Sequence, residues 1–280
     1  MGGAPIRTIA DDPDVRPLAV FAGDPASALV ATAIHAGHDV RPEVWSRLAI
    51  DEATRLREED PFTDRITECA GARVVVHRSR FEVDLNRARD GAVYRTPEQA
   101  WGLDLWRGDL PDDVVARSLG LHDAFYQALG AHLDRLAERG PFVVFDVHSY
   151  NHRRQGPDAP AEPQAGNPDV NVGTASLDRD RWAPVVDTFL DTLGATVVGG
   201  EPLDVRENVR FGGAHLARWV HERYPTTGCA LALEFKKTFM DEWTGRLDEG
   251  HLRALTQALA HTVPAVLQAV GPGDRSRGDR

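Results

Sequence analysis

The sequence feature that most constrains the fold is the stretch FVVFDVHSYN at residues 142–151. Its first four residues are apolar and follow Gly140 and Pro141, a pattern typical of a strand buried on both faces of a sheet. Asp146 and His148 then lie on one face, because side chains alternate along a strand. Open α/β sheets bind ligands at the carboxyl ends of their strands. The stretch therefore predicts a polar site there, although a hydrogen-bonded core histidine would give the same pattern.

A second apolar stretch, ALVATAIHAG at residues 28–37, also runs into a histidine, His35. Two histidines at strand ends suggest a shared metal ion, and zinc in hydrolases accepts two imidazoles and one carboxylate. The acidic segment 58–60 is the expected source of the carboxylate, although such clusters are usually solvated loops. His38 is a competing ligand, because an HxxH spacing can also reach one metal. Spacing alone does not choose among these candidates, which are Glu58, Glu59, Asp60 and His38.

The remaining pattern predicts alternating strands and helices, and therefore an α/β sandwich with a mixed central sheet and helices on both faces. Further strands are predicted at 17–23, 71–77, 195–200 and 229–235, the first of them beside 28–35 as an antiparallel neighbour. Helices are predicted at 42–56, 111–139 (one helix or two), 177–193, 214–224 and from about residue 248 onward. Pro264 is expected to end or kink the last helix.

The chain reads as one domain over residues 17–270, since no internal repeat or interior linker is visible. Residues 1–16 are expected to be loose and residues 271–280 to form a disordered tail. Residues 152–167 carry three prolines and two glycines without periodicity. A structureless loop of that length is often a lid or binding loop, and otherwise a plain surface loop.

The charge balance excludes some partners. With 32 basic and 43 acidic residues the net charge is −11, which argues against nucleic acid and anionic membranes as partners. The two cysteines form no CxxC, so neither a disulfide framework nor a thiolate zinc site is expected. No signal peptide and no apolar stretch long enough to cross a bilayer is evident, so we expect a cytoplasmic protein.

Glu234 ends the apolar strand predicted at 229–235, where burying an unpaired carboxylate would be costly. It is therefore either paired with an arginine or a working carboxylate. A carboxylate beside a metal-bound water can act as a general base if its pKa lies near the operating pH. The pattern alone leaves both explanations open.

Three arginines could bind an anion: Arg80 and Arg87, which bracket FEVDLN, and Arg210, which precedes FGG. A guanidinium binds a carboxylate through two parallel hydrogen bonds and can stabilise an oxyanion. Asn86 could share the anion if 81–86 is extended. Solvent exposure is the usual alternative for a single arginine.

Six separated segments resemble the motif series of the N-formylglutamate amidohydrolase family, in that family's order and over roughly residues 17–265. They are HAGHDVRP (35–42), SRFEVDLNR (79–87), FDVHS (145–149), PDVNVGT (168–174), RFGG (210–213) and LEFKKTFM (233–240). That family is similar in turn to zinc carboxypeptidases and aspartoacylases, in which a His-Ser-Tyr strand end, an Asn-Arg pair and a strand-end Glu recur. The resemblance implies a zinc-carboxypeptidase-like (phosphorylase/hydrolase-like) sandwich.

The resemblance also implies roles for individual residues. His35 and His148 would hold one zinc ion, and Glu234 would be the general base. Arg87 would act in catalysis and, with Asn86, anchor a substrate carboxylate. The carboxypeptidase pattern begins with HxxE, whereas His38 stands here in place of the glutamate, so the carboxylate ligand must come from elsewhere. Motif order favours Asp60 over Glu59, with His38 as a further alternative. The other implied substrate contacts are Arg80, Ser149, Asn171 and Arg210.

The implied function is zinc-dependent hydrolysis of the formyl, or small acyl, amide of an N-acylated acidic amino acid such as N-formyl-L-glutamate. The expected partner is thus a small anionic molecule. Two alternatives stay open at this point: a zinc carboxypeptidase or deacylase acting on a larger substrate, and a relative of the fold that binds a ligand without catalysis. Metal content separates the last from the others.

Overall fold

The computed structural model describes residues 7–9 and 16–271, and its central element is β5 (Phe142–Tyr150), whose nine residues are all buried. β5 pairs in parallel with β3 (Leu29–Ala33) on one side and with β10 (Gly228–Lys236) on the other. The predicted doubly buried central strand is therefore confirmed. Polar side chains at its carboxyl end lie between two further strands, as an open α/β sheet requires.

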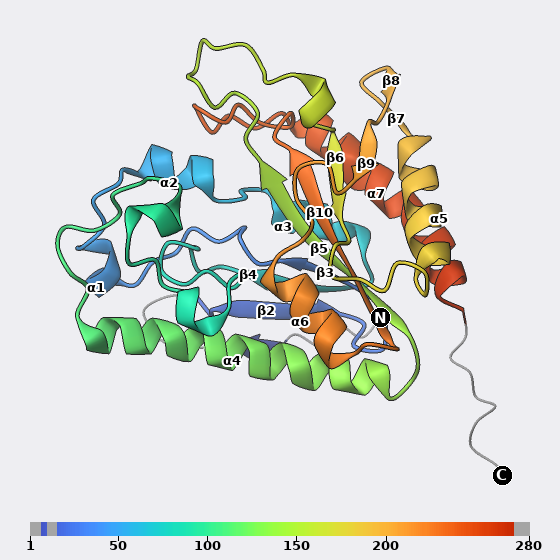
Figure 1. The fold of residues 1–280 in the computed structure, drawn as a ribbon, viewed down its shortest axis with the longest axis horizontal. Helices are drawn as coiled ribbons and strands as arrows, with labels where there is room; N and C mark the ends of the chain where they lie inside the picture. Colours follow the sequence, from blue (N-terminus) through green and yellow to red (C-terminus); the bar gives the residue numbers. More distant parts are fainter. Residues whose placement is uncertain (1–6, 10–15, 272–280) are drawn as a thin grey trace.

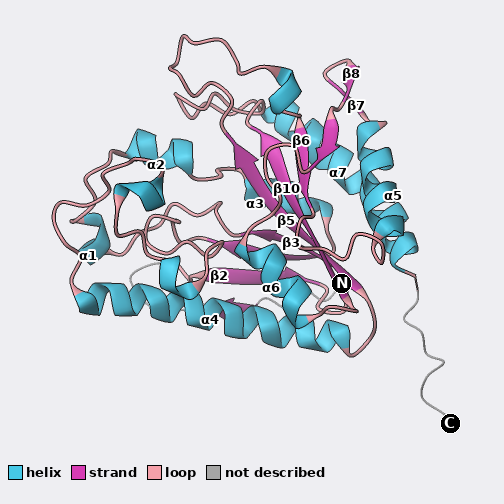
Figure 2. Ribbon diagram, viewed as in Figure 1, coloured by secondary structure: helices cyan, strands magenta, loops and turns pink. Residues whose placement is uncertain are grey.

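The sheet has eight strands and is mixed. Figures 1 and 2 show it between the flanking helices. The pairs β1–β2, β2–β4 and β10–β6 are antiparallel and the other four are parallel. Across the sheet the strands are β1 (Arg7–Ile9), β2 (Ala19–Gly23), β4 (Ala72–Val76), β3, β5, β10, β6 (Val170–Gly173) and β9 (Val205–Glu207).

Alternate side chains of β5 enter two separate cores. Val144 packs in the core covered by α4 (Asp112–Ala137) and α6 (His215–Arg223), together with Phe125 of α4. Phe145 packs in the core covered by α5 (Ala183–Gly194) and α7 (Glu249–Val270), where its ring meets Phe189 at 5.2 Å. Helices thus cover both faces of the mixed sheet, which confirms the predicted fold class (Figure 1).

The predicted pairing of 17–23 with 28–35 is wrong, because β4 lies between β2 and β3. The chain turns sharply after β2 at Gly23, whose φ is +94°. A β-carbon there would lie 2.1 Å from the carbonyl oxygen of Gly71, and the backbone N–H of Asp24 donates to that oxygen. This close approach joins the end of β2 to the start of β4. β3, the next strand in the sequence, therefore pairs on the far side of β4.

The segment expected to be one helix at 42–56 forms two, α1 (Pro42–Trp45) and α2 (Glu52–Glu58). The Asp51 side chain accepts a hydrogen bond from the backbone N–H of Thr54 at 2.7 Å, which starts a new helix there. A short helix, α3 (Thr63–Ile66), follows the acidic segment.

The other predicted helices differ mainly at their ends. The segment 111–139 forms the single helix α4, and α5 begins later than predicted, at Ala183. Pro264 does not end α7, which runs on to Val270. Leu259 and Val266, on either side of that proline, are both fully buried in the same core, so continued packing compensates for the missing backbone donor.

Two predicted segments differ from expectation in opposite directions, one being less regular than predicted and the other more regular. Residues 195–200 contribute only β7 (Val197–Val198), which pairs with β8 (Glu201–Pro202) outside the main sheet. Residues 7–9 form β1, so this part of the N-terminal segment is not loose; the rest of that segment up to residue 15, and the tail from residue 272, lie outside the described residues. No helix in the described ranges has both the length and the apolar character of a membrane span.

Candidate metal centre

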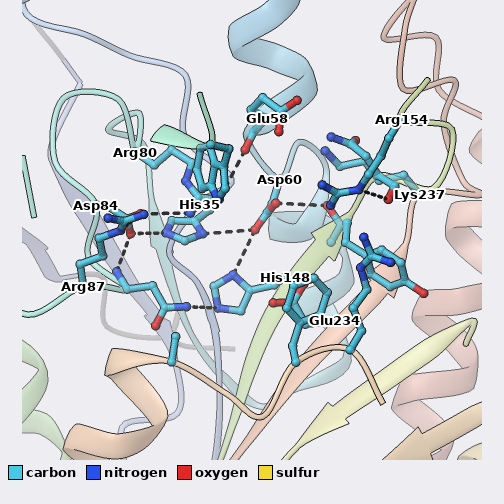
Figure 3. A pocket seen from close by; sticks show the side chains of 18 residues that line it. His35, Glu58, Asp60, Arg80, Asp84, Arg87, His148, Arg154, Glu234 and Lys237 are labelled. Carbon is cyan, nitrogen blue, oxygen red and sulfur yellow. Dashed lines mark hydrogen bonds and ion pairs between the residues drawn. The ribbon is translucent and has the colours of Figure 1, made fainter. Parts of the chain in front are cut away.

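Three buried side chains meet at the carboxyl ends of the central strands: His35 after β3, His148 in β5, and Asp60 in the loop after α2. Asp60 Oδ2 lies 3.3 Å from Nδ1 of His35 and 3.0 Å from Nδ1 of His148. One donor atom from each residue lies within 4.8 Å of the other two. Figure 3 shows the two imidazoles flanking the carboxylate. The structure thus brings together the three predicted metal ligands.

Each imidazole turns its second nitrogen toward another buried carboxylate. His35 Nε2 donates to Asp84 at 2.7 Å, and His148 Nε2 lies 3.1 Å from Asp146 Oδ2. Asp146 is held in turn by Thr32, whose hydroxyl donates to it at 2.8 Å. Carboxylates behind metal-binding histidines fix the orientation of the ring.

The donor atoms suit a zinc ion. Two imidazole nitrogens and one carboxylate are a known zinc set that leaves a position for water. Among the described residues His35 Nδ1 is buried without a hydrogen-bond partner, although it faces the other two donors. A metal ion would satisfy this nitrogen, so the residues present fit the group.

The alternative ligands face elsewhere. Glu59 pairs with His38 Nδ1 and accepts from the Ser79 hydroxyl, so these candidates bond to each other rather than to the group. Glu58 pairs with Arg57 at 2.9 Å. Of the acidic candidates, therefore, only Asp60 contacts the two histidines in the part of the chain that the structure describes.

Hydrogen bonds from Lys237 hold the loop that carries Asp60. This lysine is 1% exposed, and its Nζ donates to the carbonyl oxygens of Arg57 at 2.5 Å and Glu59 at 2.7 Å. The backbone N–H of Asp60 also donates to the carbonyl of His35 at 3.0 Å. Two of the candidate ligands, His35 and Asp60, are thereby joined through the backbone as well as through their side chains.

Glu234 lies beside this group because of the strand register. In the parallel pair β5–β10, Glu234 is directly opposite His148. Burial raises the pKa of Glu234 to about 7, and Asp60 adds to the rise while His148 and His35 oppose it. No arginine or lysine within the described ranges forms an ion pair with Glu234, so the structure does not support the alternative of a salt-bridged core glutamate.

A cavity of about 510 Å³ opens over the group. Five predicted substrate contacts line it: Arg80, Asn86, Arg87, Ser149 and Arg210. The sixth, Asn171, is not among the lining residues. It is fully buried, accepts from the backbone N–H of Arg210 at 2.8 Å and donates to the carbonyl of Phe211, so it supports the segment that carries Arg210.

The lining arginines are held to different extents. Arg80 donates to Asp84 at 3.0 Å and stacks on the Trp101 ring at 4.6 Å. Arg87 donates to the carbonyl of Gln99 at 2.6 Å, and its side chain is 30% exposed. Arg210 donates to Asn167 at 2.6 Å and to Glu162 at 3.1 Å.

Other lining residues were not predicted from the sequence. Lys237 and Asn151 lie within the quoted stretches 233–240 and 142–151 but carried no assigned role there. Phe211 falls in the motif segment 210–213 without an assigned role, whereas Trp101 stands in an irregular segment with no periodic signal. All four line the cavity.

Comparison with known proteins identifies relatives. The sequence model of the N-formylglutamate amidohydrolase family matches residues 27–240. A crystal structure of N-formylglutamate amidohydrolase from Ralstonia eutropha JMP134 is similar, with a TM-score of 0.68, 15% identity, and coverage of 95% of this chain and 97% of that chain. A gene product, Atu2144, from Agrobacterium tumefaciens gives a TM-score of 0.62, 18% identity and 96% coverage of both chains.

A weaker similarity links the chain to a metallo-carboxypeptidase from Burkholderia cenocepacia, with a TM-score of 0.46, 15% identity, and coverage of 96% of this chain and 66% of that chain. No curated protein is similar enough in sequence to count as a match.

Proposed function

Because this chain belongs to the N-formylglutamate amidohydrolase family, we propose that it is a zinc-dependent amidohydrolase that removes a formyl or other small acyl group from an N-acylated acidic amino acid, such as N-formyl-L-glutamate. The observation that carries the proposal is the buried group of His35, Asp60 and His148 directly beside Glu234, at the base of an arginine-lined cavity. These three residues would hold the zinc ion.

Zinc held there would polarise the acyl carbonyl and lower the pKa of a water. The Glu234 carboxylate takes a proton from the attacking water and returns it to the departing amine. A carboxyl group with a pKa near neutrality suits this role, because it can both accept and release a proton at the operating pH. The His35 and His148 rings stay fixed during the reaction, since Asp84 accepts from Nε2 of His35 and the Asn86 side chain bonds to Nε2 of His148.

The substrate carboxylate is bound by Arg87 with Asn86. In a chain of net charge −11, an anionic substrate is attracted only where fixed cations face it. Arg87 lines the cavity and keeps part of its guanidinium exposed, while its bond to Gln99 fixes its direction. Arg80 is committed to Asp84 and Tyr94, and we assign it mainly to shaping the site.

The test is a substrate panel with zinc-loaded and chelator-treated protein. Release of formate or acetate is measured from N-formylglutamate, N-formylaspartate, N-acetylglutamate and N-formylleucine, beside metal content by elemental analysis. We expect about one zinc per chain, no activity after chelation, and the highest kcat/KM for N-formylglutamate. The best turnover of neutral N-formylleucine would refute the specificity argument, and full activity without metal would refute the zinc mechanism.

A further inference from the structure

A smaller recess of about 160 Å³ adjoins the main cavity. The two spaces share four lining residues, Glu58, Trp101, Asn151 and Arg154, so the recess is a side branch rather than a separate pocket. A small substrate bound over the group formed by His35, Asp60 and His148 can therefore extend one of its substituents into the recess.

One cation in the recess is free for a ligand. The recess also contains Arg57, which is paired with Glu58, and Glu242, which accepts from the backbone N–H groups of His152 and Arg153 at 2.8 Å each. Arg154 donates only to the carbonyl of Asn151, at 3.4 Å, and no carboxylate of the described residues lies within ion-pair distance of it. The cavity arginines Arg80, Arg87 and Arg210, by contrast, all have a carboxylate partner.

The backbone that carries Arg154 is anchored, although it begins the long loop 152–167. Glu242, 2% exposed, binds the two preceding backbone N–H groups. The indole N–H of Trp243 donates to the carbonyl of Arg153 at 2.9 Å, and the Arg57 guanidinium stacks on that indole ring at 4.1 Å. The Arg154 side chain therefore starts from a fixed point, as a specificity contact needs.

The position of Arg154 is complementary to that of Arg87. Figure 3 shows these two arginines on opposite sides of the group formed by His35, Asp60 and His148. Trp101 and Leu103 supply apolar surface to the recess, which suits methylene groups between the reacting centre and a terminal charge. Trp101 has a φ of +56°, an uncommon conformation for a large residue, and the residue is 51% exposed.

We infer that the recess is the side-chain subsite and that Arg154 makes it selective for a side chain that ends in a carboxylate. This inference rests on the proposed function, in which Arg87 binds a substrate carboxylate, and it assigns that carboxylate as the α-carboxylate. A glutamyl side chain would lay its methylenes against Trp101 and Leu103 and place its carboxylate at Arg154.

The experiment compares N-formylglutamate with N-formylglutamine, which has the same shape without the charge. Arg154→Gln should lower kcat/KM for N-formylglutamate by about 10- to 100-fold, the effect of losing a hydrogen bond to a charged group, and leave kcat/KM for N-formylglutamine within threefold. Arg153→Ala is the matched control: Arg153 is the adjacent cation, but it pairs with Asp241 at 2.8 Å and does not line the recess, so both substrates should be unaffected.

The outcomes separate this inference from the proposed function. If the wild-type protein hydrolyses N-formylglutamate and Arg154→Gln leaves its preference over N-formylglutamine unchanged, the subsite assignment is wrong and the proposed function stands. An equal loss for both substrates also refutes selectivity at Arg154. Absence of hydrolysis of every N-formyl amino acid by the zinc-loaded wild type refutes the proposed function and the inference together. Retained turnover of N-formylglutamine by Arg154→Gln shows that the variant is folded.

Discussion

Replacing Asp84 with asparagine tests whether the carboxylate behind His35 determines the metal affinity of the site. Asp84 is 1% exposed and accepts from His35 Nε2 at 2.7 Å, from Arg80 at 3.0 Å and from the backbone N–H of Asn86 at 2.8 Å. Burial alone would raise the pKa of Asp84, but Arg80 and His35 lower it well below its usual value, so the group is a carboxylate. Asparagine keeps the shape of the side chain but loses its charge. Its amide N–H₂ also places a hydrogen-bond donor next to groups that themselves donate.

Two effects of Asp84→Asn can be estimated. Loss of the partner of a metal-binding histidine costs about 10- to 100-fold in metal affinity, or about 1.4–2.8 kcal/mol. Leaving Arg80 buried without its counter-charge costs roughly 3–5 kcal/mol in the free energy of unfolding, because its side chain is 14% exposed. We expect zinc binding to weaken and the metal-free protein to unfold at lower denaturant concentration.

Zinc dissociation constants from competition with a chromophoric chelator, and urea unfolding in the presence of EDTA, measure the two effects separately. Asp123→Asn is the control, because Asp123 is also paired with an arginine, Arg89 at 2.7 Å, but is exposed on α4. Its zinc affinity should stay within threefold of wild type. If Asp84→Asn binds zinc as tightly as wild type, then Asp84 does not orient a metal-binding His35, and the argument from ring orientation fails.

Four further predictions concern the proton transfer, the anchor, the metal and pH. Glu234→Gln should lower kcat by about 10²- to 10⁴-fold with unchanged zinc content, because the amide cannot accept the proton; loss of zinc would instead make Glu234 a ligand. Arg87→Ala should raise KM for N-formylglutamate strongly and Arg87→Lys should recover only part; equal KM values for Lys and wild type would argue against a two-bond contact. Chelation should lower the Tm of the wild type but not of a His35→Ala/His148→Ala double variant, and an equal shift in both would disprove these ligands. Burial lowers the pKa of His221 to about 4, so the unfolded chain binds a proton at this histidine at a higher pH than the folded chain does. As the pH falls from about 6.5 to 4, His221 should therefore reduce the free energy of unfolding by roughly 3 kcal/mol. In urea unfolding, this loss should be absent from His221→Gln, and the same dependence of the free energy of unfolding on pH in variant and wild type would contradict the prediction.

The central part of the fold was predictable from the sequence because its signals are local. Residues 142–145 are apolar on both faces, and alternation alone places Asp146 and His148 together. The same reasoning identified the strand that carries Glu234. Burial on both faces leaves few positions in a sheet, so such strands fall in the middle of it.

Features that depend on pairing between distant segments were not predictable. The insertion of β4 between β2 and β3 follows from the close approach of Gly23 to Gly71, which are far apart in sequence. The choice of Asp60 over Glu59 depends on how the chain leaves α2: consecutive residues there face opposite ways, and Glu59 turns to His38. Motif order favoured Asp60, but only the three-dimensional arrangement supplies a physical reason for it.

The position of β10 has a consequence for how the protein folds as it is synthesised. β10 is the last strand of the described residues, yet it lies between β5 and β6 in the sheet. Until the ribosome has released residues 228–236, the nascent chain can assemble the strands from β1 through β5. The edge of β5 that later pairs with β10 then has no neighbour. That edge presents unpaired backbone groups flanked by Phe142 to Val147, a combination prone to strand addition from other chains. The strand that places Glu234 opposite His148 therefore also covers an edge prone to strand addition, and it does so late in synthesis.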